Sequence, residues 1–317
     1  MLHTKSVHQR SAFGMAIDFK EVSVVLPTIE EESVFRLIED LRRLMPGCEI
    51  IVVDKSSSEY RKRLKVTGAK ILFQQSSGVE AATMEGFIRA KGSILANLDA
   101  DGTYNPEDLV RSVVYLKEKH LDMVLGNRFH NKQKSKAVRG YLSFGNKSIN
   151  KIYKTMHGIN IHDGLTGIFA MTREAFEAMK DAEPYRAGSM FFVMEIEKKG
   201  FTKIDEIPIS YGLRPSGSKS KLAKSKLFYG LGVAGHIVRT ARDYSPLLIF
   251  GSIGAILIIA GLVLGAFVIA SYIRSGLLTE VGRALISFML VIIGFLSIIS
   301  GLILDLLLQI AKKIDKL

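Results

Sequence analysis

The chain shows two kinds of hydrophobic pattern, and they occupy different parts of it. In the first part, short apolar runs rich in β-branched residues lie at residues 22–26, 50–53, 69–73 and 93–98. Helical patterns at residues 30–44 and 78–90 fall between them, and the first is expected to open on the acidic residues Glu30, Glu31 and Glu32. Alternation of strands and helices predicts an α/β, Rossmann-like fold with a mostly parallel sheet and helices on both faces.

The last part of the chain contains two long runs without a charge, residues 247–273 and 284–304. A helix needs about 20 apolar residues to cross a bilayer core of about 30 Å. The pattern therefore predicts two transmembrane helices that form a hairpin; two buried helices of a soluble core are the alternative. Asp305 follows the second run and is expected near a membrane interface rather than in a proton relay.

Charge separates the same two parts. The 317 residues include 43 Lys+Arg and 31 Asp+Glu, a net charge of +12, yet the mean hydropathy is +0.21. Only 5 Lys+Arg and 3 Asp+Glu follow residue 246, so nearly all of the net charge precedes the apolar runs. This composition excludes a disordered chain, and the single cysteine, Cys48, excludes an intrachain disulfide.

A run of basic residues lies directly before the two apolar runs and indicates a partner for this part of the chain. Residues 214–242 contain seven basic residues and no acidic one. Beside a bilayer such a segment is attracted to anionic lipid head groups by about 1 kcal/mol per cation, which favours lipid over nucleic acid as its partner. The excess of basic residues predicts that the part of the chain before residue 246, called the head, and both termini are cytoplasmic. Residues 3–19 lack the apolar core of a signal peptide and are expected to form a flexible arm.

The strongest local motif is NLDADG at residues 97–102, directly after a predicted buried strand. In open α/β sheets ligands bind beyond the carboxyl ends of the strands, and Asp54, Asp99 and Asp101 all fall there. Two carboxylates two residues apart can approach one divalent cation and the phosphates that it carries; Mg²⁺ and Mn²⁺ prefer such oxygen ligands. A turn with solvated acids is the alternative, because Asp-Gly favours turns.

Further motifs follow in a fixed order. They are VLPT at 25–28 with Glu31, IIVVD at 50–54, LDADGTYNPE at 98–107, LGNRF at 125–129, DGLTG at 163–167, EI at 195–196, EIP at 206–208 and an Arg-Gly-Ser-Lys series over 214–222. This set resembles the family 2 glycosyltransferases with a GT-A fold, and within them the dolichyl-phosphate sugar synthases. DGTYNP, GNRF and the two apolar runs look like archaeal enzymes that load the first N-glycan sugar onto dolichyl phosphate.

The resemblance implies a domain organisation. Residues 1–20 are expected to be the flexible arm, residues 21–213 the GT-A catalytic domain and residues 214–245 a basic juxtamembrane linker or amphipathic helix. Residues 246–311 would hold the two membrane helices, and residues 312–317 the cytoplasmic tail.

The resemblance also implies roles for individual residues. Asp99, Asp101, Arg128 and Glu195 would form the catalytic set, with Asp101 on the metal of the diphosphate and Asp99 on the metal or the ribose. The donor nucleotide would contact Pro27, Thr28, Glu31, Asp54, Gly78 and Asp99. The acceptor phosphate would contact Arg128, Arg139, Ser143, Arg214, Ser220 and Lys221, with Lys219 as the alternative to Lys221. Asp163 and Thr166 would shape the pocket. Phe191, Phe192 and Met194 are expected in the core rather than against a sugar.

The implied activity is transfer of one sugar from a nucleotide-sugar to dolichyl or polyprenyl phosphate, with inversion and with Mg²⁺ or Mn²⁺. UDP-GlcNAc is the favoured donor; GDP-mannose and UDP-glucose are the alternatives. A catalytically weak, membrane-tethered binder of sugar nucleotides is the alternative outside enzymes. A processive polysaccharide synthase fits poorly, because that group carries a Gln-x-x-Arg-Trp motif and this chain has no tryptophan.

Three departures from the family pattern cluster on the nucleotide side. Glu30 stands where the family has asparagine, Lys55 follows Asp54 in place of Asp or Gly, and the glycine-rich turn reads Gly78-Val79-Glu80. They leave the identity of the donor open.

Overall fold

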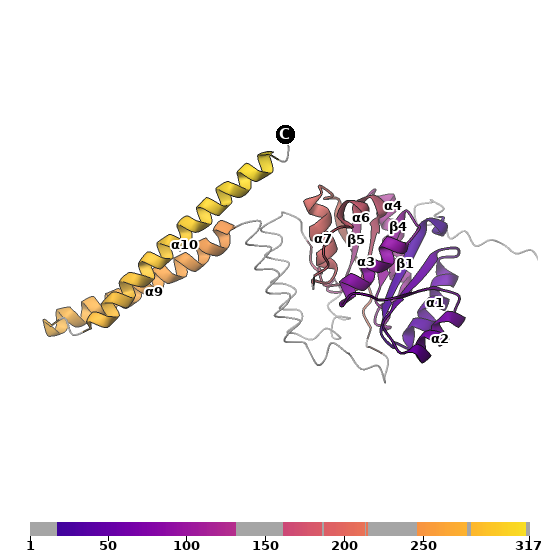
Figure 1. Ribbon diagram of the computed structural model, residues 1–317, viewed down its shortest axis with the longest axis horizontal. Helices are drawn as coiled ribbons and strands as arrows, with labels where there is room; N and C mark the ends of the chain where they lie inside the picture. The colour runs from indigo at the N-terminus through magenta and orange to yellow at the C-terminus, as the bar shows by residue number, and fades with distance from the viewer. Residues whose placement is uncertain are drawn as a thin grey trace, which may run out of the picture. The chain divides into compact units, whose positions relative to one another are not determined.

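The computed structural model describes residues 18–130, 161–185, 187–212, 214, 246–277 and 280–314. The chain divides into two compact units, Met1–Val233 and Ala234–Leu317 (Figure 1).

The first unit is built on a seven-stranded sheet with the order β3-β2-β1-β4-β6-β5-β7. Its strands are β1 (Val22–Thr28), β2 (Glu49–Asp54), β3 (Lys70–Phe73), β4 (Ile94–Leu98), β5 (Met123–Asn127), β6 (Ile168–Thr172) and β7 (Ile204–Pro208). The predicted mostly parallel α/β fold is confirmed. Only β6 runs the other way, antiparallel to both β4 and β5, so the sheet is mixed.

Helices cover both faces of the sheet (Figure 1). One face carries α1 (Ser33–Leu44), α2 (Ser58–Val66) and α4 (Pro106–Glu118), which share a buried cluster with the strands. The other carries α3 (Val79–Arg89), α6 (Arg173–Met179) and α7 (Ser189–Lys198). A short 3-10 turn, η1 (Phe19–Glu21), precedes β1.

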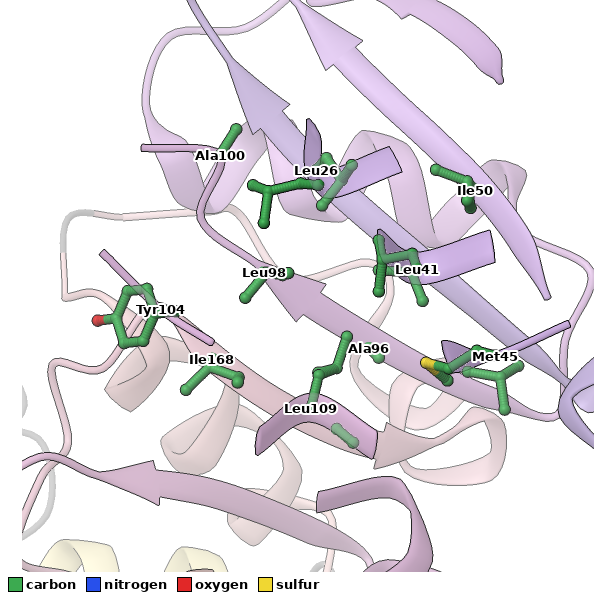
Figure 2. Close-up of a cluster of buried hydrophobic side chains, with 14 of the residues drawn as sticks. Leu26, Leu41, Met45, Ile50, Ala96, Leu98, Ala100, Tyr104, Leu109 and Ile168 are labelled. Carbon is green, nitrogen blue, oxygen red and sulfur yellow. The ribbon is translucent and has the colours of Figure 1, made fainter. Parts of the chain in front are cut away.

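Alternate residues of the central strands feed the two cores. Leu26, Ile50, Ala96 and Leu98 point toward α1 and α4, where Leu41 and Leu109 meet them (Figure 2). Fully burying a side chain of this size stabilises the fold by about 1.5–3 kcal/mol, so this core holds β1 and β4 in place beneath the loops that follow them.

The second core is aromatic. Phe87 of α3 lies edge-on to Phe169, Phe176 and Phe192, with ring centroids 5.4–6.0 Å apart. Phe191, Phe192 and Met194 of α7 are all buried in this cluster, which confirms their prediction as core residues. The aromatic core fixes α7 against the sheet.

The start of α1 differs from its prediction. The helix begins at Ser33 because Glu30 has φ 53°, a left-handed backbone that cannot belong to a right-handed helix. Asparagine adopts this conformation more readily than glutamate, so the expected family asparagine suits the turn. Here the Glu30 N–H donates to Ser56 Oγ at 2.6 Å, which ties the turn to the loop after β2.

The second unit contains two long helices, α9 (Pro246–Ser275) and α10 (Val281–Ile314). Both are long and apolar enough to cross a membrane, and only 17% and 11% of their most apolar windows are buried within the protein. The predicted run after residue 284 is extended at both ends, because α10 begins at Val281 and continues past Asp305.

Glycines let the two helices approach closely. A Cβ on Gly254 would lie 2.5 Å from the Gly294 carbonyl oxygen, and one on Gly294 would lie 2.7 Å from the Gly254 carbonyl oxygen. Ser287 and Ser297 donate side-chain hydrogen bonds to the carbonyls of Gly261 and Phe250 across the pair. Small residues and interhelical hydrogen bonds of this kind hold helices together in lipid.

Candidate functional site

The carboxyl ends of β1, β2 and β4 meet at one edge of the sheet. Thr28 pairs with Asp54 at the ends of β1 and β2, and β1 also pairs with β4 in parallel. Pro27, Thr28, Asp54 and Asp99 therefore lie at or just beyond one sheet edge, where the strand pattern predicted a site.

Asp99 follows β4 in a crowded position. Its N–H donates to the Gly167 carbonyl at 3.0 Å, and a Cβ on Gly167 would lie 2.0 Å from Asp99 Oδ2. Glycine is therefore required beside this carboxylate. Burial, and then the charge of Asp101, raise the pKa of Asp99 to about 7, whereas Arg128 acts in the opposite direction.

Asp101 lies in the turn that follows. Its Oδ1 accepts from the Thr103 N–H at 3.0 Å and from the Thr103 hydroxyl at 2.5 Å. Its Oδ2 accepts from Arg214 Nη2 at 2.6 Å, and Arg214 Nη1 lies 3.7 Å from Glu31 Oε1. Burial opposes the charge on Arg214, but Asp101 and Glu31 raise its pKa above the ordinary value. Three predicted site residues thus meet in one ion cluster.

Asp54 is fully buried at the end of β2. Its Oδ1 accepts from the Ser56 N–H at 3.1 Å and also from the Ser56 hydroxyl, and its Oδ2 lies 3.5 Å from Arg61 Nε. Lys55, the departure noted above, donates from Nζ to Ser77 Oγ at 3.3 Å. The loops after β2 and β3 are therefore joined beside Asp54.

Gly78 directly precedes α3 as its N-cap residue, with φ 115°, a conformation that favours glycine. Glu80, in the first turn of that helix, is buried, and its Oε1 accepts from the N–H groups of Ala187 and Gly188 at 3.0 and 2.8 Å. The residue that replaces an expected family glycine therefore links α3 to the start of α7.

Arg128 and Asp163 form a two-pronged ion pair although 35 positions separate them. Arg128 Nε donates to Asp163 Oδ2 at 2.7 Å, and Nη2 donates to Oδ1 at 2.8 Å. Nη2 also reaches the Leu165 carbonyl at 2.8 Å, and Nη1 lies 3.3 Å from the Tyr104 hydroxyl. Burial lowers the pKa of Arg128, but Tyr104 and Asp163 outweigh it and keep that pKa well above its ordinary value.

The hydrogen-bond inventory of Arg128 limits what it can do. A guanidinium has five N–H donors, and those contacts engage four of them within the described part of the chain, leaving one on Nη1. Asp163, which is fully buried, also neutralises the charge. Arg128 can thus offer an anion one N–H from a rigid frame rather than an uncompensated positive charge.

The remaining predicted residues differ in their placement. Thr166 is buried, and its hydroxyl accepts from the Ile168 N–H at 3.4 Å. Glu195, on α7, accepts from Lys198 Nζ at 2.5 Å and from the Tyr185 hydroxyl at 3.1 Å. It is therefore held by residues near it in sequence, and no contact of the described residues joins it to Asp99 or Asp101. Arg139, Ser143, Ser220 and Lys221 lie outside the described residues, as does Lys219.

A divalent cation fits the Asp99–Asp101 pair on two grounds. The two carboxylates are close enough for the charge of Asp101, after burial, to raise the pKa of Asp99, and the Arg214 contact shows that Asp101 accepts a cationic partner. Among the described residues no group of three or more His, Cys, Asp or Glu gathers. Mg²⁺ or Mn²⁺ would then take its other ligands from waters and phosphate oxygens, as Mg²⁺ commonly does.

Sequence reasoning missed two contributors. Tyr104 is buried, and its hydroxyl accepts from the Gly167 N–H at 2.7 Å; it lies within the DGTYNP motif. Glu206 is nearly buried and binds the backbone of His162 and Asp163; it lies within EIP. Both motifs were visible, but neither reveals which groups its polar side chain binds.

Comparison with known structures defines the class of the fold. Glucosyl-3-phosphoglycerate synthase from Mycobacterium tuberculosis, crystallised with Mn²⁺ and UDP-glucose, matches with a TM-score of 0.52 and 17% identity over 69% of this chain and 78% of that one. Mannosyl-3-phosphoglycerate synthase from Rubrobacter xylanophilus matches with a TM-score of 0.54 and 17% identity, over 70% and 74% of the two chains. The first unit has a GT-A fold, as predicted.

The family follows from the sequence. Residues 23–180 match the profile described as glycosyl transferase family 2, so the chain contains a family 2 glycosyltransferase domain.

Three curated relatives extend the comparison. Glycosyltransferase AglJ of Haloferax volcanii is 28% identical over 92% of this chain and 95% of its own length. Dolichol-phosphate mannosyltransferase of Pyrococcus furiosus is 28% identical over 66% and 61% of the two chains. Undecaprenyl-phosphate 4-deoxy-4-formamido-L-arabinose transferase of Pectobacterium carotovorum is 28% identical over 80% and 77%.

Proposed function

We propose that this glycosyltransferase moves a single sugar from a nucleotide-sugar to dolichyl or another polyprenyl phosphate, with inversion at the anomeric carbon. The names of two relatives specify a polyprenyl phosphate together with different sugars, which supports the acceptor more strongly than the donor. UDP-GlcNAc is the favoured donor, and GDP-mannose or UDP-glucose is the alternative. The product would serve protein N-glycosylation or the assembly of a cell-surface glycan.

The observation that carries the choice of acceptor is the state of the site carboxylates. Asp163 is neutralised by Arg128, and Glu195 is held by Lys198, so each is engaged by a cation. A hydroxyl acceptor needs a general base to remove its proton. A phosphate acceptor is already anionic at neutral pH and needs none, which suits a site where Asp163 and Glu195 are bound to Arg128 and Lys198 and Asp99 is assigned to the metal.

In this proposal Pro27, Thr28, Glu31, Asp54 and Gly78 hold the nucleotide, and Asp101 and Asp99 hold the cation. A bound Mg²⁺ or Mn²⁺ would neutralise charge on the donor diphosphate. Arg128 and Arg214 orient the acceptor phosphate and the diphosphate, together with Arg139, Ser143, Ser220 and Lys221. Arginine suits this task, because two anions must approach each other against their repulsion: Arg214 would supply positive charge, and Arg128 would supply one fixed N–H.

The reaction balances without a proton transfer. An oxygen of the lipid phosphate forms a bond to the anomeric carbon while the bond from that carbon to the donor phosphate oxygen breaks. The electron pair leaves with the nucleoside diphosphate. Attack from the side opposite the leaving group inverts the configuration at that carbon.

The two long helices give the proposal its setting. We infer that α9 and α10 cross the membrane as a hairpin and that the head and both termini are cytoplasmic, because basic residues flank the helices on that side. The proposed organisation retains the domain boundaries expected from the sequence, with residues 214–245 as a basic linker near lipid head groups. Anchoring brings the site to an acceptor that cannot leave the bilayer.

The test is a transfer assay with the full-length protein in membranes. The membranes are incubated with Mg²⁺ or Mn²⁺, dolichyl phosphate and labelled UDP-GlcNAc, UDP-glucose or GDP-mannose. The expected product is an acid-labile monosaccharide lipid that partitions into organic solvent and depends on the cation. Absence of a sugar lipid from every donor would reject the activity, and tight nucleotide binding without turnover would identify a binder instead. Asp101→Ala with full activity would reject the assignment of the cation site.

A further inference from the structure

Glu206 of β7 holds together two segments that the chain separates. Its side chain is only 8% exposed. Oε1 accepts from the N–H groups of His162 and Asp163 at 2.9 and 2.7 Å. Oε2 accepts from Asn127 Nδ2 at 3.1 Å and contacts His162 Nδ1 at 2.8 Å. Both oxygens therefore bind residues outside β7.

The two segments that Glu206 joins are those that form the Arg128–Asp163 pair. Asn127 ends β5, directly before Arg128, and pairs with Pro208 of β7. Asp163 Oδ2 accepts from both the N–H and the Nε of Arg128, at 3.0 and 2.7 Å. A two-pronged arginine–carboxylate bond requires a fixed relative orientation of the two planes. Because Glu206 fixes the backbone of Asp163, it fixes the carboxylate that orients Arg128.

The same frame extends to Asp99. Arg128 donates to the Leu165 carbonyl, the Gly167 N–H donates to the Tyr104 hydroxyl, and the Gly167 carbonyl accepts from the Asp99 N–H. Glu206 contacts neither Arg128 nor Asp99 directly in any of these bonds. Its influence passes through residues 162–167.

The cost of burying charge indicates that the hydrogen bonds of Glu206 serve to hold residues 127, 162 and 163 in place. Glu206 and Asp163 are both anionic and nearly buried, and burying such groups is costly unless hydrogen bonds satisfy them. A neutral side chain could fill the space beside Asn127, but it could not accept from four donors with two oxygens.

We propose that Glu206 is a positioning residue of the transferase site: it fixes residues 162–167 and thereby aims at the acceptor phosphate the Nη1–H of Arg128 that the described residues leave unbonded. This inference rests on the proposed function, because it assigns the acceptor side to Arg128. It gives the EIP motif a role that its sequence does not reveal.

The test compares Glu206→Gln and Glu206→Ala in the full-length protein. Gln keeps one oxygen for the two backbone N–H groups but places an NH₂ against Asn127. We expect Glu206→Gln to raise the KM for dolichyl phosphate about tenfold with little change in kcat, and Glu206→Ala to lower kcat/KM about 100-fold, the cost of a misplacement of about 1 Å. Mn²⁺-dependent UDP affinity should stay within about twofold of wild type in Glu206→Gln, because Glu206 bonds to no donor-side residue and reaches Asp99 only through the far end of residues 162–167.

Asp205→Asn is the matched control. Asp205 is the preceding residue of β7; its Oδ2 accepts from the Tyr115 hydroxyl at 2.7 Å and its Oδ1 from the Glu206 N–H at 2.8 Å, and asparagine keeps an oxygen for the second of these bonds. It should leave the KM for dolichyl phosphate unchanged. Parallel loss of UDP affinity and turnover in Glu206→Gln would overturn the proposal in favour of a general structural role, and so would an unchanged KM in both Glu206 variants.

Hydrogen–deuterium exchange separates this inference from the proposed function. Residues 161–167 should exchange faster in Glu206→Ala and at the wild-type rate in Asp205→Asn. If the wild-type protein transfers no sugar to dolichyl phosphate, the proposed function fails, whereas faster exchange confined to residues 161–167 and 127–129 would still support positioning by Glu206. Unchanged exchange in Glu206→Ala would reject it.

Discussion

Arg214 Nη2 lies 2.6 Å from Asp101 Oδ2, so an arginine contacts the carboxylate that the proposed function assigns to a metal. The same guanidinium lies 3.7 Å from Glu31 on the nucleotide side. Arg214 and a divalent cation would therefore compete for Asp101, and binding of the cation would free Arg214 to contact phosphate.

This competition predicts that Arg214→Gln strengthens Mn²⁺ binding but slows sugar transfer. Removing a positive charge beside Asp101 should tighten Mn²⁺ binding severalfold, because like charges no longer repel. Sugar transfer should fall about 100-fold, as when one stabilising donor is lost from an active site. Mn²⁺ binding is measured by electron paramagnetic resonance and transfer by the sugar-lipid assay. Arg36→Gln is the control, because that side chain is 88% exposed; weaker Mn²⁺ binding in Arg214→Gln would contradict the competition.

Asp99 predicts a pH dependence of stability. Burial, and then Asp101, raise its pKa to about 7 in the folded protein, from an ordinary value of 3.8. The folded state thus holds this proton more tightly than the unfolded state does. The contribution of Asp99 is fully present below pH 3.8 and is lost as the pH rises through about 7.

Asp99→Asn isolates this effect, because Asn resembles the protonated carboxyl. In EDTA the variant should be more stable than wild type at pH 8, and the difference should shrink steadily toward pH 5. The measurement is the denaturation midpoint of each protein at several pH values. A difference that does not change with pH would show that Asp99 is ionised throughout.

The Arg128–Asp163 pair predicts strong coupling in stability. Removing one partner leaves an uncompensated buried charge, which costs about 3–5 kcal/mol. Arg128→Met and Asp163→Asn should each destabilise the protein on that scale, and the double variant should be destabilised by about 1–3 kcal/mol less than the sum of the two. Denaturant unfolding of the four proteins gives the cycle. Additive losses would mean that the two side chains act independently.

The sequence was informative where function depends on strand ends. Apolar runs placed β1, β2 and β4 correctly, and the parallel arrangement then brought Thr28, Asp54 and Asp99 to one edge. The sequence did not predict the strand order beyond β4. There β6 lies antiparallel between β4 and β5, and the local hydrophobic pattern carries no information on which strands are neighbours.

The same limit applies to the side chains. The LGNRF and DGLTG motifs indicated Arg128 and Asp163 as separate contacts for the acceptor and the pocket, and nothing in their spacing shows that the two bind each other. Glu195 is predicted in the catalytic set, and nothing in the EI motif shows that its carboxylate binds Lys198, three residues later on the same helix. Long-range pairing and competition between partners depend on the fold, which a motif does not encode.

The close contact between Gly167 and Asp99 predicts that one methyl group added at position 167 disturbs the Asp99 carboxylate. A Cβ at this position would lie 2.0 Å from Asp99 Oδ2, so Gly167→Ala must displace that carboxylate. We expect Mn²⁺-dependent UDP binding to weaken at least about tenfold and transfer to fall about 100-fold, because a misplaced group costs this much. Gly212→Ala is the control, since among the residues that the structure describes its Cβ would meet only the Thr103 carbonyl, at an ordinary 3.6 Å. Equal effects of the two substitutions would contradict the role of Gly167.

Gly254 and Gly294, where α9 and α10 approach closely, predict how the packing of these two helices responds to an added methyl group. We call this pair the glycine seam. Gly254→Ala and Gly294→Ala each place a methyl group against the backbone of the facing helix, at 2.5 and 2.7 Å. The helices must then move apart and weaken the bonds from Ser287 and Ser297. Cysteine pairs placed across α9 and α10 should cross-link more slowly in these variants than in Gly251→Ala, whose Cβ would meet only Leu247 at 3.7 Å. Because close approach is the main attraction between helices in lipid, an unchanged cross-linking rate would show that the seam does not hold the hairpin.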